Sequence, residues 1–329
     1  MKENSNFHPS FPEASLGIRN FHHPRRPLTM GIVNINDDSF CQDGTVDPAK
    51  AMAKALALVE EGADIIDAGA ESARTNRRAI SVAEEVDRFG PFLAEFHRQV
   101  RNRFATPPVE GQCWPPAVSL NTWRTEVVRS ILPLGGDLLN DIGGLPDDSN
   151  AALCARHGVS LLIMHTQGTP KVAHTHVTYR EVVAEVASFF EEKIQLALRS
   201  GMSPAHLVLD PGIDFAKQKD DNLRLYRDLK YLVDRFPQPM LLPVSRKTVI
   251  GEVLGISDPN LRDAGTVACI ARGLAAGASI FRVHNVKATV DVLRVLQELG
   301  GSPEARVMIS ANDTSAKEPR RRTDPENTK

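Results

Sequence analysis

Arg282-Val283-His284-Asn285 follows a short apolar run, and it is one of eight segments in which an apolar run ends in polar residues. The other seven occupy residues 30–34, 64–67, 119–122, 138–141, 161–165, 207–210 and 241–247. Short buried strands that each present a polar residue at the carboxyl end are how a (β/α)8 barrel assembles an active site. We therefore predict an α/β fold, a single TIM barrel. Its site should combine carboxylates and amides from the middle strands with cations from the last two.

Helical patterns occupy the segments between these strands. Asp47-Pro48 predicts the start of one helix, because proline is tolerated in a first turn, and Ser81-Val82-Ala83-Glu84 predicts another through a capping box. Further helices are expected over residues 125–132, 149–157, 179–200, 222–236, 261–276 and 288–299. Strands that alternate with helices indicate a parallel sheet. An open dinucleotide-binding sheet is disfavoured, because no GxGxxG motif follows the first strand.

Polar segments flank the predicted barrel at both ends. We expect the barrel to occupy residues 27–302, between an N-terminal tail of residues 1–26 and a C-terminal tail of residues 303–329. The second tail is rich in charged residues, serine and proline, which predicts disorder.

The composition is that of an ordinary globular protein. The chain has 329 residues, 42% of them hydrophobic, and a net charge of -2, so neither nucleic acid nor a membrane surface is an expected partner. No apolar stretch reaches the roughly 18 residues that a membrane span needs, and the N-terminus lacks the apolar core of a signal peptide. The four cysteines are far apart without a CxxC pair, so we expect reduced thiols and a cytoplasmic location.

Two of the strand-end residues are candidates for recognising a hydrogen-bonding ligand. Asp210 precedes Pro211-Gly212, and its carboxylate could accept two hydrogen bonds from an amidine-like or guanidine-like edge. An aspartate in this position could equally form a turn. Asn140 offers both a donor and an acceptor, and it could equally cap a loop.

Cationic residues end the last two predicted strands. Ser245-Arg246-Lys247 and Arg282-Val283-His284 would lie side by side, and loops after the last two strands of such barrels frequently form an anion site. Asn34 could bind a hard cation through its amide oxygen, since Mg2+ keeps several waters and takes phosphate oxygens with few protein ligands. No cluster of histidine and cysteine indicates a zinc site.

These motifs, in this order over residues 28–299, resemble those of the dihydropteroate synthase family. The segment Met30 to Phe40 is similar to the family's MGI-x-NVTPDSF, and Gly62 to Arg74 is similar to GADIIDVGGESTR. Asn140-Asp141-Ile142 parallels ND-V/I, and Met164-His165 with Gly168-Thr169-Pro170 parallels MH-x-x-G-x-P. The segment that begins at Asp210 parallels DPGIGFGK, the one at Ser245 parallels SRK, and the one at Arg282 parallels RVHDV.

The resemblance implies a transferase of folate biosynthesis. Members of the family join 6-hydroxymethyl-7,8-dihydropterin diphosphate to 4-aminobenzoate, giving dihydropteroate and diphosphate. No general base is assigned, because an aromatic amine is already neutral near pH 7. The expected cofactor is Mg2+, and the expected partners are the two small substrates and a second copy of the chain.

The resemblance also implies a role for individual residues, several of which would bind the pterin. Asn140 and Asp210 would hold its aminopyrimidine edge, and Lys247 would reach its carbonyl and ring-nitrogen side. Met164 and Phe215 would line the pterin ring. The diphosphate would be bound by Arg282 and His284, and by Asn34 through Mg2+. Ser245 would lie near the aminobenzoate channel, while Arg74 and the loop before Gly44 would close over the site. Of these, Lys247, Arg282, His284 and Asp210 are the expected catalytic groups.

The sequence departs from the family's pattern at several of these motifs. Asn121 stands in the substrate site where the family's SVDT has aspartate, so a cationic pterin should be stabilised less. The other departures are Asn36-Asp37-Asp38 for TPD, Ser72-Ala73-Arg74-Thr75-Asn76 for STRPG, Asp214 and Ala216 for two glycines of DPGIGFGK, and Asn285 for the aspartate of RVHDV.

Two alternatives to a synthase follow. The first is a pterin-binding paralogue without synthase activity. The second is a methyltetrahydrofolate-binding methyltransferase barrel, which has no need of an anion clamp, so Arg282 and His284 argue against it.

Small residues recur along one predicted helix. Ala264, Ala268, Ala271 and Ala275 would form a stripe, which is compatible with a homodimer contact or with packing against the barrel's own strands.

Overall fold

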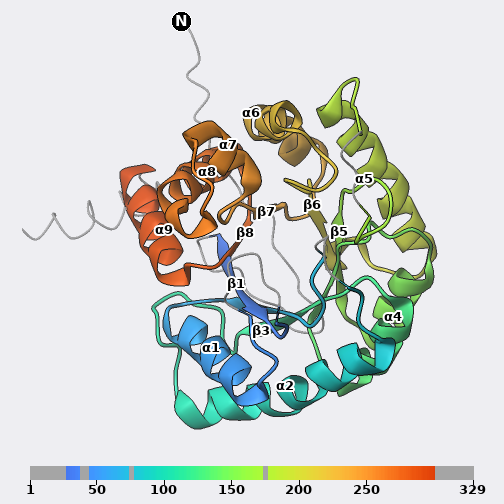
Figure 1. Cartoon of the computed structure of the whole chain (residues 1–329), viewed down its shortest axis with the longest axis vertical. Helices are drawn as coiled ribbons and strands as arrows, with labels where there is room; N and C mark the ends of the chain where they lie inside the picture. The colour runs from blue at the N-terminus through green and yellow to red at the C-terminus, as the bar shows by residue number, and fades with distance from the viewer. Residues whose placement is uncertain (1–26, 38–43, 74–77, 173–176, 301–329) are drawn as a thin grey trace, which may run out of the picture.

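Eight parallel strands form a nearly closed barrel surrounded by helices in this computed structural model (Figure 1), which describes residues 27–37, 44–73, 78–172 and 177–300. The strands are β1 (Leu28–Asn34), β2 (Ile65–Gly69), β3 (Ala117–Asn121), β4 (Leu138–Asp141), β5 (Ser160–Met164), β6 (Leu207–Asp210), β7 (Leu241–Pro243) and β8 (Ile280–Val283). Their order is β6-β5-β4-β3-β2-β1-β8-β7, so the last strands return to the first. The predicted TIM barrel is confirmed.

The barrel closes most weakly between β6 and β7. A single bridge pairs Leu209 with Met240, and the Leu209 N–H donates to the Pro239 carbonyl at 3.0 Å. The strands are almost entirely buried, as expected when helices cover a parallel sheet.

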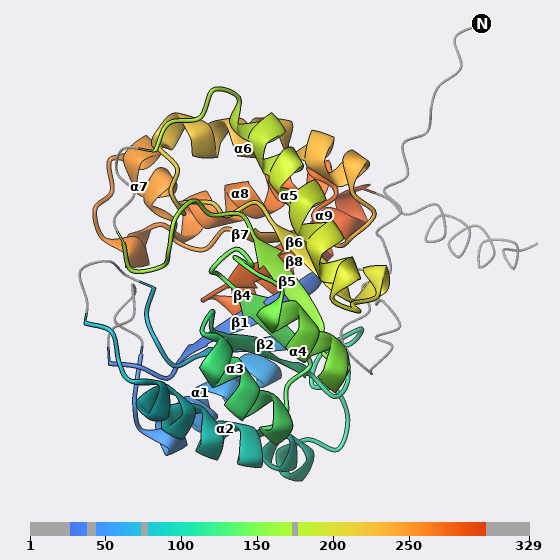
Figure 2. The ribbon, with the colours of Figure 1, turned by 90° about the vertical axis from the view of Figure 1, so that its right-hand side faces the viewer.

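Helices cover the outside of the sheet all the way round (Figures 1 and 2). They are α1 (Pro48–Glu60), α2 (Val82–Arg103), α3 (Thr125–Ile131), α4 (Ser149–His157), α5 (Val182–Arg199), α6 (Lys219–Arg235), α7 (Thr248–Leu254), α8 (Asp263–Ala276) and α9 (Val286–Gly300). Asp47 caps α1 through the N–H groups of Ala49 and Lys50, and the Ser81 side chain accepts from the Glu84 N–H, so both predicted starts are confirmed.

Some element bounds differ from the sequence prediction. Helix α6 begins at Lys219, three residues before the predicted start, because its first turn is charged and carries no apolar periodicity. Gln218 and Asp221 form a capping box there instead. Helix α7 was not predicted, since its buried residues, Val249, Ile250 and Gly251, are consecutive and show no helical spacing.

Two apolar layers make up the core. Inward-facing residues such as Met30, Ile65, Leu162 and Val208 fill the barrel interior, and a larger layer packs between the strands and the helices. Phe215 is half-buried against the interior layer. The interior layer thus provides an apolar floor beneath the carboxyl ends of the strands.

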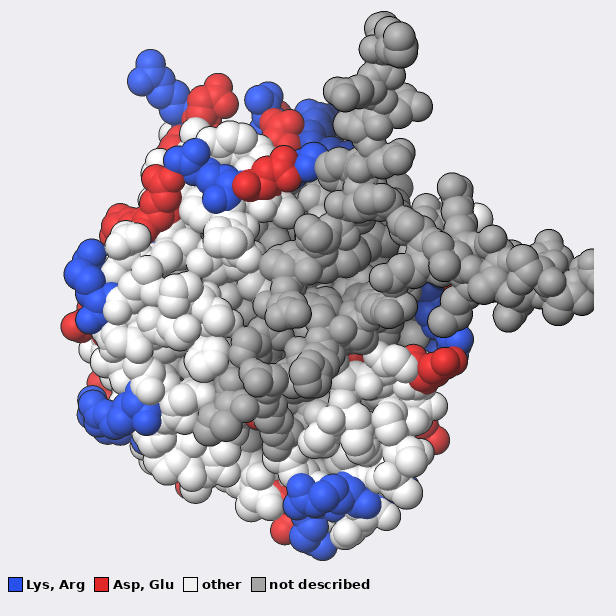
Figure 3. Space-filling view, turned by 180° about the vertical axis from the view of Figure 1, so that it is seen from behind, with Lys and Arg blue, Asp and Glu red and all other residues white. Residues whose placement is uncertain are grey.

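The described surface carries charges of both signs (Figure 3), and three of the four cysteines lie among the described residues. On the face shown in Figure 3, described lysine and arginine side chains lie beside aspartate and glutamate. Cys113, Cys154 and Cys269 are reduced thiols. None of the helices that the structure describes combines the length and apolar character needed to cross a bilayer. The two predicted tails lie outside the described residues.

Asp64, which directly precedes β2, connects the amino-terminal part of β1 to the segment that precedes β3. This fully buried carboxylate accepts hydrogen bonds from the Thr29 N–H at 2.7 Å and from the Cys113 N–H at 2.8 Å. It thereby ties β1 and the approach to β3 to the start of β2.

We expect Asp64→Ala to lower the free energy of unfolding by about 2–5 kcal/mol, because two buried N–H groups lose their acceptor. Urea denaturation followed by circular dichroism measures this change. Asp87→Ala, on the exposed face of α2, is the control and should change stability by no more than about 0.5 kcal/mol. Equal effects of the two substitutions would contradict the role of Asp64.

Candidate active site

A cavity of about 300 Å³ opens at the carboxyl ends of the strands. All eight strands or the loops that follow them contribute to its wall. Each predicted site residue that the structure describes lines it: Asn34, Asn121, Asn140, Met164, Asp210, Phe215, Ser245, Lys247, Arg282 and His284. Arg74 and residues 38–43 of the loop before Gly44 lie outside the described residues.

A network of polar contacts beneath the cavity is centred on Asp67. In the sequence pattern this residue ends a strand, and it was not predicted as a site residue. Its buried carboxylate accepts from the Ser119 hydroxyl at 2.6 Å and from the Asn140 amide at 3.1 Å through Oδ1. Through Oδ2 it accepts from the Asn121 amide at 3.2 Å and pairs with Arg282 Nε at 2.7 Å. One carboxylate therefore joins residues from β2, β3, β4 and β8.

Asp67 also fixes which way two amide groups face. Because Asn140 and Asn121 both donate their Nδ2 groups to Asp67, each is left with its carbonyl oxygen as the group available to a ligand. The Oδ1 atom of Asn140 is buried and has no hydrogen-bond partner among the described residues. Since Asn140 lines the cavity, its side chain brings to the cavity wall an acceptor that lacks a partner in the described part of the chain.

Asp210 is the second acceptor. It is 3% exposed, and its Oδ1 accepts from the Gly212 N–H at 2.7 Å. Burial raises the pKa of this carboxyl to about 6, against the opposing effects of the Gly212 N–H and the charges of Lys247, Lys217 and Arg282. Asp210 is therefore ionised at neutral pH and protonates in mild acid.

Lys217, in the loop after β6, was not predicted as a functional residue. Its buried ammonium donates to the carbonyls of Gly212 and Phe215 at 3.0 Å, and lies 2.8 Å from His165 Nδ1. Burial lowers the pKa of Lys217 to about 7, and burial together with the lysine charge lowers the pKa of His165 to about 2. His165 is thus neutral, and Lys217 holds the loop beside Asp210 in a closed turn.

The cationic side of the cavity comes from β7 and β8. Lys247 Nζ donates to the Ile213 carbonyl at 2.8 Å and lies 5.0 Å from the centre of the Phe215 ring. His284 Nδ1 is 2.8 Å from the Ser245 hydroxyl, which also accepts from the His284 N–H at 3.1 Å. With Arg282, these groups form one basic wall.

Arg246 does not belong to that wall, although the sequence grouped it with the other cations. Its guanidinium binds the Asp263 carboxylate, with Nε at 2.7 Å, and the Asn260 side chain at 2.9 Å. It has a φ of 57°, and this backbone conformation directs the chain so that Lys247, its neighbour, reaches the cavity.

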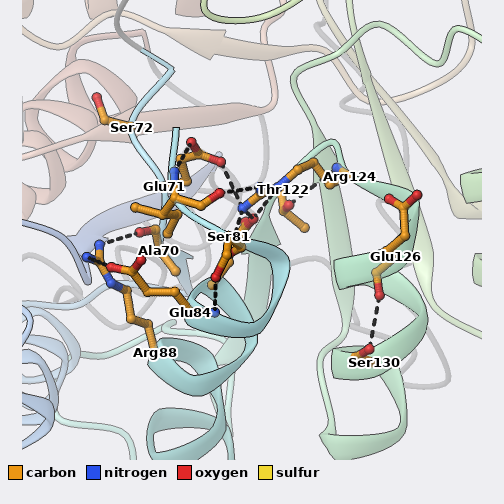
Figure 4. A network of polar contacts seen from close by, with 12 residues as sticks. Ala70, Glu71, Ser72, Ser81, Glu84, Arg88, Thr122, Arg124, Glu126 and Ser130 are labelled. Carbon is orange, nitrogen blue, oxygen red and sulfur yellow. Dashed lines mark hydrogen bonds and ion pairs between the residues drawn. The ribbon is translucent and has the colours of Figure 1, made fainter. Parts of the chain in front are cut away.

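A second polar network borders the cavity beside the loop after β2 (Figure 4). Glu71, which lines the cavity, pairs with Arg124 at 2.9 Å and with Lys171 at 3.1 Å. Arg124 Nε also binds the buried Glu85 at 2.7 Å, and Lys171 donates to the Ser72 carbonyl at 3.0 Å. These contacts tie the loops after β2, β3 and β5 together, and sequence patterns gave no sign of them.

Comparisons with known proteins give a consistent result. A family model described as "Pterin binding enzyme" matches residues 30–284. The chain is 38% identical to the dihydropteroate synthase of Neisseria meningitidis serogroup C, over 84% of this chain and 93% of that protein.

Solved structures agree. Dihydropteroate synthase from Thermus thermophilus in complex with 4-aminobenzoate is 35% identical, with a TM-score of 0.71 over 84% of this chain and 95% of that one. The Xanthomonas albilineans enzyme in complex with 7,8-dihydropteroate is 33% identical, with a TM-score of 0.68 over 85% of this chain and 95% of that one.

We expect Asn121→Asp to destabilise the folded protein more at pH 8 than at pH 5, because the new carboxylate would lie against Asp67. Two adjacent carboxylates raise the folded-state pKa of one of them, so stability falls as pH rises through that pKa; the extra loss should be about 1–3 kcal/mol. Denaturation at both pH values measures it. Asn121→Ala is the control, with a loss that does not depend on pH. An equal loss for Asn121→Asp at both values would show that Asp67 does not govern this position.

Proposed function

The chain belongs to the dihydropteroate synthase family of pterin-binding enzymes, transferases of the folate pathway, and we propose that its cavity joins 6-hydroxymethyl-7,8-dihydropterin diphosphate to 4-aminobenzoate. The observation that carries this proposal is the polarity of the cavity. Acceptors from Asn140 and Asp210 lie in the same cavity as a wall formed by Lys247, Arg282 and His284.

The pterin ring accounts for the acceptors. Its aminopyrimidine edge carries adjacent N–H donors, which match the Asp210 carboxylate and the unpartnered oxygen of Asn140. Met164 and Phe215 would cover the ring, since both border the apolar interior of the barrel. Lys247 would donate to the carbonyl and ring-nitrogen side of the pterin.

The diphosphate accounts for the basic wall. In the reaction the bond between the pterin methylene carbon and the diphosphate oxygen breaks, and a bond forms from that carbon to the amine nitrogen. Negative charge collects on the departing diphosphate, where Arg282 and His284 would stabilise it. The amine then releases a proton to water. It needs no general base, because it attacks as a neutral group.

Mg2+ fits the donor set of this cavity only with the help of the substrate. The described residues contain no cluster of three acidic, histidine or cysteine side chains that could hold a metal by themselves. Asn34 lines the cavity and offers an amide oxygen, and Mg2+ commonly takes its remaining ligands from phosphate and water. Asn34 would hold the ion, which when bound would offset charge on the diphosphate.

The second substrate would enter beside the loops after β1 and β2. Asn36, Ser72 and Ala73 line that side of the cavity. Glu71, held by Arg124 and Lys171, would keep this wall in place for 4-aminobenzoate. Ser245 is hydrogen-bonded to His284, so its contribution near the aminobenzoate would act through that pair.

A homodimer through α8 is part of the proposal. Ala264, Ala268 and Ala275 are exposed, so this part of the predicted stripe does not pack against the barrel's own strands. Leu261, just before α8, is 68% exposed. An apolar face of small side chains allows two helices to approach closely. The cytoplasmic location stays a prediction from the sequence.

The test of the function is release of diphosphate from the pterin substrate, measured with Mg2+ in the presence and absence of 4-aminobenzoate. We expect release to require 4-aminobenzoate and to yield dihydropteroate. Pterin binding without product would favour the paralogue without synthase activity. The methyltransferase alternative finds no support among the relatives of this chain named here.

We expect Arg282→Ala to weaken binding of the pterin diphosphate by about 10- to 100-fold, the value of one lost charge-assisted hydrogen bond. Binding of 6-hydroxymethylpterin, which lacks phosphate, should weaken less, through the lost ion pair with Asp67 alone. Calorimetry of both ligands on the same preparation separates an anion contact from general damage. Arg129→Ala, on the exposed side of α3, is the control. Equal losses for both ligands would refute the anion role.

The pKa of Asp210 predicts how pterin affinity depends on pH. The pKa of about 6 applies to the free protein, and the ionised Asp210 carboxylate accepts hydrogen bonds from the ligand. Affinity for the pterin should therefore be constant above about pH 7 and fall by up to roughly tenfold per pH unit below pH 6. Calorimetry with 6-hydroxymethylpterin avoids titration of phosphate. Asp210→Asn should bind more weakly, with a flatter profile. A parent protein whose affinity did not change between pH 5 and 7 would contradict this account.

A further inference from the structure

The loop after β6 contains two residues in a backbone conformation that favours glycine. Asp214 has a φ of 67° and Ala216 a φ of 50°. Both stand where the DPGIGFGK pattern has glycine, and a side chain in this region raises the energy of the backbone. A compensating contact is therefore expected at one or both positions.

Asp214 makes such contacts through its carboxylate. Oδ2 accepts from the Thr248 N–H, and Oδ1 accepts from the Val249 N–H at 3.3 Å and from the Asn222 amide at 3.2 Å. The Asp214 N–H donates in turn to Asn222 Oδ1 at 2.8 Å. The carboxylate is thus held on both sides, by α6 and by α7.

Helix α7 depends on this distant carboxylate at its first turn. Its N-cap residue, Lys247, makes no side-chain capping bond, and unsatisfied N–H groups at a helix start need an acceptor. Asp214 supplies that acceptor from a loop more than thirty residues earlier in the chain.

A second hydrogen bond runs in the opposite direction between the same two segments. Lys247 Nζ donates to the Ile213 carbonyl at 2.8 Å. We call this pair of interactions the reciprocal clamp: the Asp214 carboxylate with the N–H groups of Thr248 and Val249, and the Lys247 ammonium with the Ile213 carbonyl. Phe215, the next residue in the loop, lies against the Lys247 ammonium.

The clamp fixes Lys247 relative to Phe215, and both side chains line the cavity that also contains Asp210. Burial lowers the pKa of Lys247, and the carboxylates of Asp214 and Asp210 oppose that shift. Asp214 itself lines the cavity, yet both of its oxygens are engaged by the protein.

We propose that Asp214 is a positioning residue for the pterin ring, which holds Lys247 and Phe215 in place through the reciprocal clamp. This inference rests on the proposed function, since it takes the pterin to be the ligand of that wall. A glycine at this position would permit the same backbone but could not form the carboxylate contacts of the clamp. The aspartate found in this chain therefore adds these contacts to the site.

The experiment compares Asp214→Gly, Asp214→Asn and Ala216→Gly with the parent protein. Calorimetry gives the Kd of 6-hydroxymethylpterin, and steady-state kinetics at saturating pterin diphosphate gives the Michaelis constant for the aromatic amine substrate. We expect Asp214→Gly to raise the Kd of 6-hydroxymethylpterin by about tenfold, which corresponds to the loss of one hydrogen-bonded contact. The Michaelis constant for the aromatic amine should stay within about twofold of the parent value. Asp214→Asn retains only one acceptor oxygen and turns an NH2 donor toward a second N–H donor, so it should recover only part of the affinity.

Ala216→Gly is the matched control, because it removes the neighbouring strained side chain without removing a clamp contact, and its Kd should equal that of the parent. Asp214→Gly loses a cap but relieves backbone strain, so thermal unfolding should confirm that it is folded. The inference is overturned if Asp214→Gly binds like the parent or if both substrates are affected equally. A parent protein that does not bind the pterin would instead overturn the proposed function.

Discussion

The hydrogen bonds and ion pair of the Asp67 carboxylate, buried in the middle of β2, are the interactions on which the active-site arrangement depends. A buried charge is strongly destabilising unless it is paired and fully hydrogen-bonded. Asp67 meets that requirement by taking donors from β3, β4 and β8 at once. The amides of Asn121 and Asn140 and the guanidinium of Arg282 are therefore held in place before any ligand arrives, so less ordering remains to be done on binding.

This constraint explains how the chain tolerates asparagine at position 121. The Asn121 amide donates to Asp67, so the side chain keeps its place in the wall and still presents an oxygen to the cavity. What is lost is a negative charge, and the adjacent Asp67 carboxylate remains. The substitution therefore removes a charge from the proposed pterin side, while Asn121 still takes part in the Asp67 network.

Much of this architecture could be predicted from the sequence, because the relevant signals are local. An apolar run ending in Asn140, Asp210 or Arg282 identifies both a strand and the residue that it presents, and parallel strands bring such ends together. The interactions that were missed join segments far apart in the sequence: Asp67 on β2 with Arg282 on β8, Lys217 with His165, and Arg124 with Glu71. Arg246 was misplaced for a related reason, since sequence patterns do not show that its guanidinium binds Asp263, seventeen residues later in the chain.

The two sides of the cavity are held by different kinds of structure. Asn140, Asp210 and Arg282 lie on strands, so the barrel fixes their backbone positions, whereas Phe215 and Lys247 follow β6 and β7 and are held by the reciprocal clamp. Glu71 follows its strand, and it is held by ion pairs to Arg124 and Lys171 from two other loops. Such loop-borne walls can change sequence without disturbing the barrel. Among the departures from the family pattern, Asn36, Asp37, Ser72 and Ala73 lie in the described parts of loops after β1 and β2, whereas Asn121 on β3 and Asp214 and Ala216 after β6 lie on the proposed pterin side.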